Sequence, residues 1–290
     1  MTSKLLRRPS FVLVLMMLLV VSLTACGEED TDDDFYNFIE NGRLVRLPPG
    51  GGELGDVALA IPYDHAVGTG DISDVFDADG WGFSLSYESR VVVSMEATGS
   101  LNPFVELYNL NSQPIIYNNE IYTYGEIMEF NDDDGPGLDA VVTGVLPAGR
   151  YGILTWSSES GPVEGNYELH VISSYPDGDD FGLVSIGYDG GFDGVELFEG
   201  NNIEPDTLSY VFTLTETAML DFVVATVAGT PDVSMRLVDQ EGSTIFTLDP
   251  AGTDDPVIND QMLNAGTYMW LISNAINADA GMVDLTLRVE

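Results

Sequence analysis

The sequence is poor in cysteine, in histidine and in positive charge. Of its 290 residues, 48 are aspartate or glutamate, nine are lysine or arginine and two are histidine, and Cys26 is the only cysteine. A single cysteine excludes an intramolecular disulfide and any zinc site built from several cysteines. The formal net charge of −39 argues strongly against nucleic acid as a partner, because binding phosphates requires clustered cations.

Residues that could carry catalysis are also scarce. His170 lies in a strand-like segment, at a position typical of a surface or edge, and His65 precedes the first recognisable motif. No serine stands in a nucleophile-elbow context with a base, and abundant acids do not by themselves make a catalytic pair. We therefore expect no enzymatic activity. A hydrolase of unfamiliar type, with carboxylates in a cleft between two domains, stays open as an alternative.

The first 25 residues have the features of a secretory signal. Lys4, Arg7 and Arg8 precede an apolar run, Phe11 to Leu23, which is too short to span a membrane comfortably. The run ends in Leu23-Thr24-Ala25-Cys26-Gly27, which resembles the lipobox of bacterial lipoproteins. The resemblance implies that residues 1–25 are removed, that Cys26 carries the acyl chains, and that the protein is extracytoplasmic. Gly27 then favours the outer membrane if the organism is Gram-negative.

The residues after Cys26 cannot form a core. Glu28 to Asp34 read EEDTDDD, and Leu47 to Gly52 read LPPGGG. Such a segment is solvated and repels itself. We expect residues 26–56 to be an acidic tether between the membrane anchor and the folded part.

Beyond residue 57 the chain consists of short alternating runs separated by turn residues, and it repeats itself. Trp81 to Leu85 matches Tyr210 to Leu214, and Leu146 to Tyr151 matches Leu263 to Tyr268. Alternation predicts half-buried strands, and a repeat of about 115–130 residues indicates two domains rather than a solenoid. We predict an all-β chain with two tandem antiparallel, jelly-roll-like β-sandwiches, at residues 57–174 and 175–290.

Five motifs follow in order in the first repeat: Asp77 to Phe83, Leu101 to Asn109, Asn131 to Asp134, Leu146 to Tyr151, and Gly165 to Val171. This ordered set resembles the bacterial pre-peptidase C-terminal domain, a β-sandwich often appended to secreted peptidases. The second repeat is more divergent and lacks a clear acidic loop. The resemblance implies a non-catalytic domain that attaches a protein to a substrate or matrix.

The motif aromatics have a structural interpretation. Trp81, Phe83, Tyr210 and Phe212 are expected in the cores, with a sugar-binding platform as the alternative. Tyr151 and Tyr268 are expected to bury their rings while each hydroxyl finds a partner. Gly149 and Gly266, two residues earlier, are expected in tight turns with positive φ.

The acidic turns suggest calcium, which takes six to eight oxygen ligands. The best candidate site is formed by Asn131, Asp132, Asp133, Asp134 and Asp139; weaker ones are Asp74 to Asp79, Asp177 to Asp180 and Asp189 to Asp193. None has the full EF-hand spacing. The alternative is that these acids cap their own turns.

Together these features predict a membrane-anchored lipoprotein with non-catalytic binding or adhesion domains. The ligand, a protein or polysaccharide of the envelope or of the surroundings, is not specified by the sequence. A structural role, as a spacer or assembly subunit of the envelope, is the remaining alternative.

Overall fold

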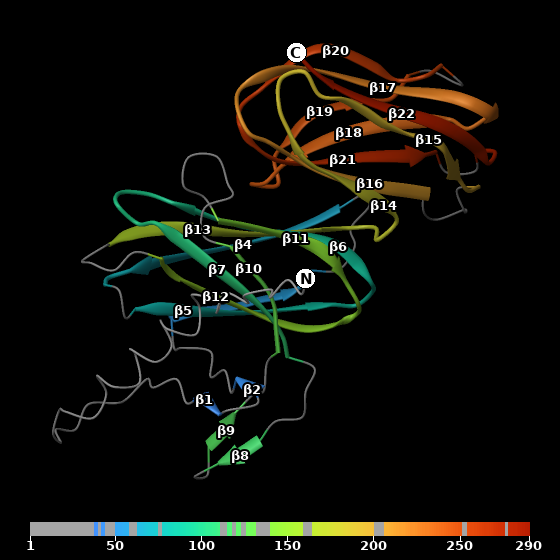
Figure 1. Cartoon of the computed structure of the whole chain (residues 1–290). Coiled ribbons are helices and arrows are strands. Elements are labelled where there is room, and N and C mark those ends of the chain that lie inside the picture. Colours follow the sequence, from blue (N-terminus) through green and yellow to red (C-terminus); the bar gives the residue numbers. More distant parts are fainter. Residues whose placement is uncertain are drawn as a thin grey trace, which may run out of the picture. The chain divides into compact units, whose positions relative to one another are not determined.

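The structure is a computed structural model that describes residues 38–39, 42–43, 50–57, 63–74, 77–110, 115–117, 120–122, 126–131, 140–158, 164–199, 206–250, 254–275 and 278–290. Every regular element in these ranges is a β-strand (Figure 1). No helix among them is long and apolar enough to cross a membrane. The prediction of an all-β chain with two tandem sandwiches is confirmed.

The first sandwich contains a five-stranded sheet, in the order β10-β7-β12-β5-β3, and a four-stranded sheet, in the order β11-β6-β13-β4. Its strands are β3 (Gly50–Asp56), β4 (Tyr63–Ile72), β5 (Ala78–Leu85), β6 (Ser89–Ala97), β7 (Pro103–Asn109), β10 (Glu126–Asn131), β11 (Ala140–Leu146), β12 (Gly149–Ser157) and β13 (Gly165–Ser174). Two short pairs, β1 (Phe38–Ile39) with β2 (Gly42–Arg43) and β8 (Ile115–Tyr117) with β9 (Glu120–Tyr122), form separate two-stranded sheets.

The second sandwich repeats this arrangement, with one sheet in the order β14-β16-β21-β18-β19 and the other in the order β15-β22-β17-β20. Its strands are β14 (Gly178–Val184), β15 (Asp189–Leu197), β16 (Asp206–Leu214), β17 (Ala218–Gly229), β18 (Val233–Asp239), β19 (Thr244–Leu248), β20 (Val257–Leu263), β21 (Gly266–Asn274) and β22 (Gly281–Val289). Strand for strand, the two orders correspond, and the sequence repeat is therefore a repeat of topology.

Each five-stranded sheet ends in a parallel strand, which the antiparallel prediction did not include. β3 runs parallel to β5, and β14 runs parallel to β16. β3 also takes in Gly50–Asp56, the last seven residues of the range predicted as tether. With four glycines and one apolar residue, Leu54, among its seven residues, β3 shows no apolar alternation. The pattern therefore could not reveal it.

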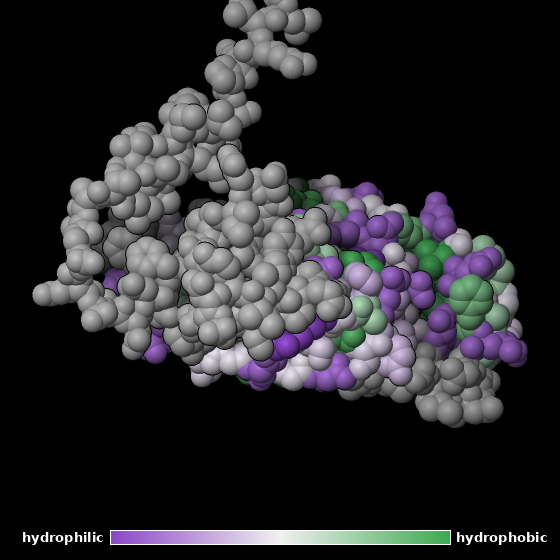
Figure 2. Space-filling view, turned by 90° about the horizontal axis from the view of Figure 1, so that it is seen from below, coloured by the Kyte–Doolittle hydropathy of each residue, from purple (hydrophilic) through white to green (hydrophobic). Residues whose placement is uncertain are grey.

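Each sandwich has its own core, and the motif aromatics lie in these cores as predicted. Trp81, Phe83, Tyr210 and Phe212 are all buried. On the face drawn in Figure 2, the coloured residues form a mixture of hydrophilic areas and small hydrophobic patches. The interpretation of these four rings as core residues is thus confirmed, and none of them forms an exposed sugar-binding platform.

Tyr151 and Tyr268 occupy equivalent places and make equivalent hydrogen bonds. The Tyr151 hydroxyl donates to the Pro147 carbonyl (2.5 Å), and the Tyr268 hydroxyl donates to the Asn264 carbonyl (2.9 Å). The prediction of positive φ at the preceding glycines is wrong, because the described residues with positive φ do not include them. At Gly266 the constraint is space, since a Cβ there would lie 3.3 Å from the Tyr268 ring.

A third apolar cluster joins residues from the outer faces of one sheet of each sandwich. Val92, Val141 and Ile172 come from the four-stranded sheet of the first sandwich. They pack with four residues of the five-stranded sheet of the second: Val211, Val238, Met269 and Leu271. Polar contacts flank the cluster, including the Ser209 hydroxyl donating to the Ser174 hydroxyl (2.7 Å). Both sandwiches accordingly belong to one compact unit, Tyr36–Glu290.

The core of the first sandwich contains a buried polar network. The Tyr167 hydroxyl donates to Asp79 Oδ2 (2.5 Å) and accepts from Trp81 Nε1 (2.9 Å) and from the Thr155 hydroxyl (2.8 Å). Burial raises the pKa of Asp79, although the hydrogen bond from Tyr167 opposes that effect, and burial also raises the pKa of Tyr167. The network connects strands β5, β12 and β13 across both sheets.

Candidate functional site

Most residues of the predicted calcium loop, and the predicted lipidation site, lie outside the described residues. This applies to Cys26 and to Asp132, Asp133, Asp134 and Asp139. Asn131 is described, as the last residue of β10, where it pairs with Val105 of β7. The calcium site and the lipid anchor therefore stay predictions.

The weaker acidic turns are described in large part, and protein groups contact their carboxylates. Asp77 accepts hydrogen bonds from both the backbone N–H and the hydroxyl of Ser73 (2.8 Å each). Asp189 forms an ion pair with Arg288 (3.1 Å). In the described part of the chain, no three histidine, cysteine, aspartate or glutamate side chains are arranged to hold a metal ion. Asp77 thus caps its own turn, as the alternative interpretation expects, whereas Asp189 pairs with an arginine instead.

The two histidines, well separated in the sequence, form a pair. His65 of β4 and His170 of β13 have stacked rings with centroids 5.3 Å apart, and His65 Nε2 lies 3.1 Å from His170 Nδ1. Burial lowers the pKa of both histidines, and the mutual charge interaction with His170 lowers the pKa of His65 further.

The prediction of a surface or edge position for His170 is wrong, because only 4% of the residue is exposed. Its side chain points away from the core of the first sandwich, on the outer face of the four-stranded sheet. The turn between β18 and β19 of the second sandwich covers that outer face. The Ser94 hydroxyl donates to the Gln240 carbonyl (2.8 Å), and a Cβ at Gly242 would lie 2.4 Å from His65 Nδ1. The acids around the pair are Asp64, Glu168 and Glu241.

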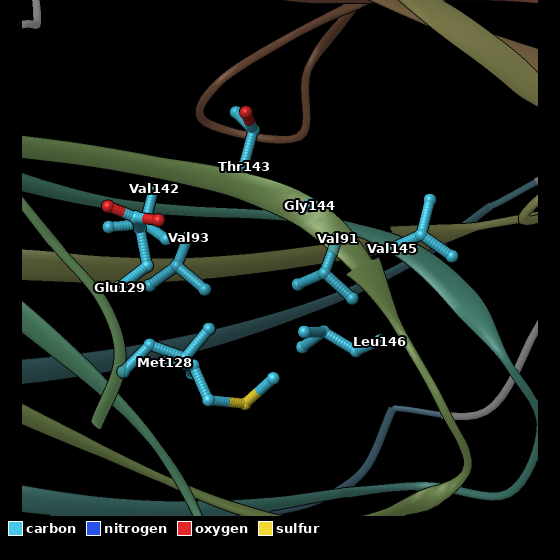
Figure 3. Close-up of a pocket in the computed structure, with 10 residues that line it drawn as sticks. Val91, Val93, Met128, Glu129, Val142, Thr143, Gly144, Val145 and Leu146 are labelled. Carbon is cyan, nitrogen blue, oxygen red and sulfur yellow. The ribbon is translucent and has the colours of Figure 1, made fainter. Parts of the chain in front are cut away.

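An apolar cavity of about 190 Å³ opens between the two sheets of the first sandwich (Figure 3). Its lining comes from Val91 and Val93 of β6, Leu107 of β7, Met128 and Glu129 of β10, and residues 142–146 of β11. β10 and β11 are the terminal strands of their sheets, so the cavity lies at an edge of the sandwich. Met128 and Val145, in its lining, are 38% and 42% exposed.

Figure 3 shows how the side chains surround this space. Those of Val91, Val93, Met128 and Leu146 point into the region beneath β11, whereas Thr143 points away from it on the other side of the strand. The alternation follows from strand geometry, in which successive side chains point to opposite faces. A ligand in the cavity would therefore contact aliphatic groups and one thioether, with the Glu129 carboxylate also in the lining.

The second sandwich shows why the cavity exists. Glu129 of β10 pairs with Leu107, and the corresponding pair in the second sandwich is Phe246 of β19 with Leu237. Phe246 packs edge-on against Phe222, with ring centroids 5.3 Å apart. The position of Phe222 is taken in the first sandwich by Val93. Two phenyl rings thus fill in one repeat the region that a glutamate and a valine leave open in the other.

A missing side chain on β11 enlarges the cavity. Gly144 pairs with Val91, whose side chain faces the core, so a side chain at Gly144 would face the core as well. A Cβ at Gly144 would have nothing within 4 Å. The corresponding residue in the second sandwich is Gln261, which pairs with Leu220. Glu129, Val93 and Gly144 together therefore leave this space open in the first repeat.

The chemistry of this lining suits binding. Glu129 is the one ionisable residue among the ten that line the cavity, and the others are apolar apart from Thr143. A single carboxylate at an apolar opening attracts a positive charge, but it supplies neither the acid–base pair nor the carboxylate pair of a hydrolase. The apolar lining residues can hold an apolar group, and Glu129 can hold a cation beside it.

This site was not predicted from the sequence, although two signals for it are present there. Gly144 lies in the mostly apolar segment from Val141 to Leu146, at a position whose side chain would face the core. The second signal is the glutamate at position 129, and it is visible only in an alignment of the two repeats that matches Glu129 with Phe246. That alignment depends on strand register, because a bulge in each strand, at Met128 and at Ile245, disturbs the count of residues.

No family model matches this sequence, and no curated protein matches it. Several solved structures are similar in fold. One is a pre-peptidase C-terminal domain of collagenase from Bacillus anthracis, the type of domain that the motifs resemble. The two sequences are 13% identical, the match covers 43% of this chain and 99% of that chain, and the TM-score is 0.31. Another is PliG of Aeromonas hydrophila, a periplasmic inhibitor of g-type lysozyme, with 16% identity, 42% and 99% coverage and a TM-score of 0.25.

A third similar structure is CorA of Methylomicrobium album, a surface-associated copper-binding protein, with 11% identity, coverage of 43% of this chain and 100% of that chain, and a TM-score of 0.28. At these identities the likeness concerns the fold of one sandwich domain.

Proposed function

We propose that this chain is a non-catalytic binding protein, held on the outer side of a membrane through Cys26, whose binding site is the edge cavity of the first sandwich. The observation that carries the proposal is the difference between the two repeats. They have the same topology, yet one edge is closed by a pair of phenylalanines and the other is left open. An empty apolar cavity lacks the packing contacts that its lining could make, and it therefore lowers stability.

The anchoring part of the proposal rests on the sequence. Leu23 to Gly27 resemble a lipobox, and an acidic segment of the kind seen in Glu28–Asp34 would keep the sandwiches away from an anionic membrane. The test is metabolic labelling with radioactive palmitate in a host that processes lipoproteins. The wild-type chain should be labelled and sediment with membranes, and Cys26→Ser should lose both properties. Labelling of the Cys26→Ser variant, or export of an unlabelled wild-type chain, would refute the anchor.

The binding part is tested with a small apolar ring. A cavity of about 150 Å³ lined by apolar side chains can bind benzene, and a ligand that binds only the folded state raises its stability. Toluene should therefore raise the melting temperature of the full-length protein in phosphatidylcholine nanodiscs. Gly144→Leu, which places a side chain in the cavity, should abolish that rise.

The matched control is Gln261→Leu, which introduces the same residue at the corresponding position of the second sandwich and should keep the rise. Because toluene also enters the lipid, the comparison between these variants is the measurement. An equal response of all three proteins would show that the cavity is not the binding site.

A further inference from the structure

The two repeats allow the ligand of the edge cavity to be specified further. We propose that the cavity accepts an aromatic side chain from a cationic, extended segment of a partner protein. This inference rests on the proposed function, because it concerns the occupant of the same site.

The shape of the occupant follows from the second sandwich. There, the ring of Phe246 comes from the terminal strand β19 and packs against the ring of Phe222 in the core. The first sandwich has Glu129 and Val93 in the corresponding places, so it lacks both rings. A partner that inserts one phenyl group between the sheets would restore packing that the second repeat makes within its own chain. The cavity, at about 190 Å³, has room for a ring of that size.

The charge of the occupant follows from the rim. Glu129 is exposed and lines the cavity, and no lysine or arginine is among the lining residues. The whole chain carries a formal charge of −39, so its field attracts cations and repels anionic segments. An aromatic residue flanked by arginine or lysine is therefore favoured over one flanked by acids.

The extended form of the occupant follows from the sheet edges. β10 and β11 each end their sheet, and an edge strand presents backbone N–H and carbonyl groups that an added strand can pair with. A peptide lying along such an edge points alternate side chains toward the interior. One of those side chains would fill the cavity, while its neighbours remain outside near Glu129.

The experiment uses the full-length protein in phosphatidylcholine nanodiscs and a fluorescein-labelled pentapeptide with a central phenylalanine between two arginines. Binding is measured by fluorescence anisotropy, with empty nanodiscs as the blank. We expect replacement of the phenylalanine by alanine to weaken binding at least about tenfold, since burial of a phenyl ring is lost. Gly144→Leu should weaken binding by a similar factor, and Gln261→Leu should leave it within about twofold.

Charge is tested separately. Glu129→Gln and a peptide with glutamates in place of the arginines should each weaken binding. If the peptide binds wild type and Gly144→Leu equally, it sits elsewhere on the acidic surface and the inference is overturned. If toluene stabilises the wild type but no aromatic peptide binds, the cavity is a binding site for another ligand and only the inference fails. If neither binds, both proposals fail.

Discussion

Replacement of Tyr167 by phenylalanine tests the buried network of the first sandwich. The change removes one oxygen and leaves the ring in place. That oxygen is bonded to Asp79 Oδ2, Trp81 Nε1 and the Thr155 hydroxyl at 2.5, 2.9 and 2.8 Å. After the substitution, the Asp79 carboxylate loses its donor and the Trp81 indole loses its acceptor. Thr155 keeps its longer bond to the Asp79 carbonyl (3.3 Å).

The size of the effect follows from these losses. A buried polar group left without a partner costs about 1–3 kcal/mol, and more if it is charged. Two such groups give a loss of about 2–6 kcal/mol, a large part of the 5–15 kcal/mol that is typical of a domain. Tyr151→Phe removes a hydroxyl with one carbonyl partner, Pro147, and should cost only about 0.5–1.5 kcal/mol.

The assay is urea denaturation of the full-length variants at pH 7, with Tyr268→Phe as a second control of the Tyr151 type. The free energy of unfolding that Tyr167→Phe loses should become smaller as the pH falls. Asp79 has a raised pKa in the folded state, so the penalty for its buried charge is present above that pKa and is relieved when the carboxyl takes up a proton. If Tyr167→Phe costs no more than Tyr151→Phe, the network does not hold the two sheets together and the reasoning is refuted.

Three further predictions concern the other parts of the molecule. Because burial lowers the pKa of His65 and His170 below the ordinary 6.5, protons favour the unfolded chain. Urea stability should therefore fall as the pH drops below about 6.5, and His170→Asn should flatten this dependence. Ile172→Asp places an unpaired charge in the cluster between the sandwiches and should cost about 3–5 kcal/mol in calorimetry; a change below about 1 kcal/mol would contradict that packing. If the predicted calcium loop binds, millimolar CaCl₂ should raise the melting temperature relative to EDTA at equal ionic strength, and Asp132→Ala with Asp134→Ala should abolish the rise; identical melts would refute the calcium site.

The sequence alone predicted the architecture of the folded part because its signals are local. Alternation in Leu285 to Val289 directly reports one buried face of a strand. The repeat of Leu146 to Tyr151 at Leu263 to Tyr268 reports a second copy of the fold. The burial of Trp81, Phe83, Tyr210 and Phe212 was predicted from the same alternation, whereas the partners of the Tyr151 and Tyr268 hydroxyls, the Pro147 and Asn264 carbonyls, were identified only in the structure.

The candidate site and the burial of the histidines depended on tertiary structure. His170 has the alternation of an outward position, and only the second sandwich, through the turn at Gln240–Gly242, removes it from water. The cavity required the pairing of β10 with β7 and of β11 with β6, which places Glu129 and Gly144 beside one opening. Strand pairing is set by contacts between distant parts of the chain. A local pattern can therefore show which face of a strand is apolar, but only the paired sheets show whether a side chain is there to fill the space.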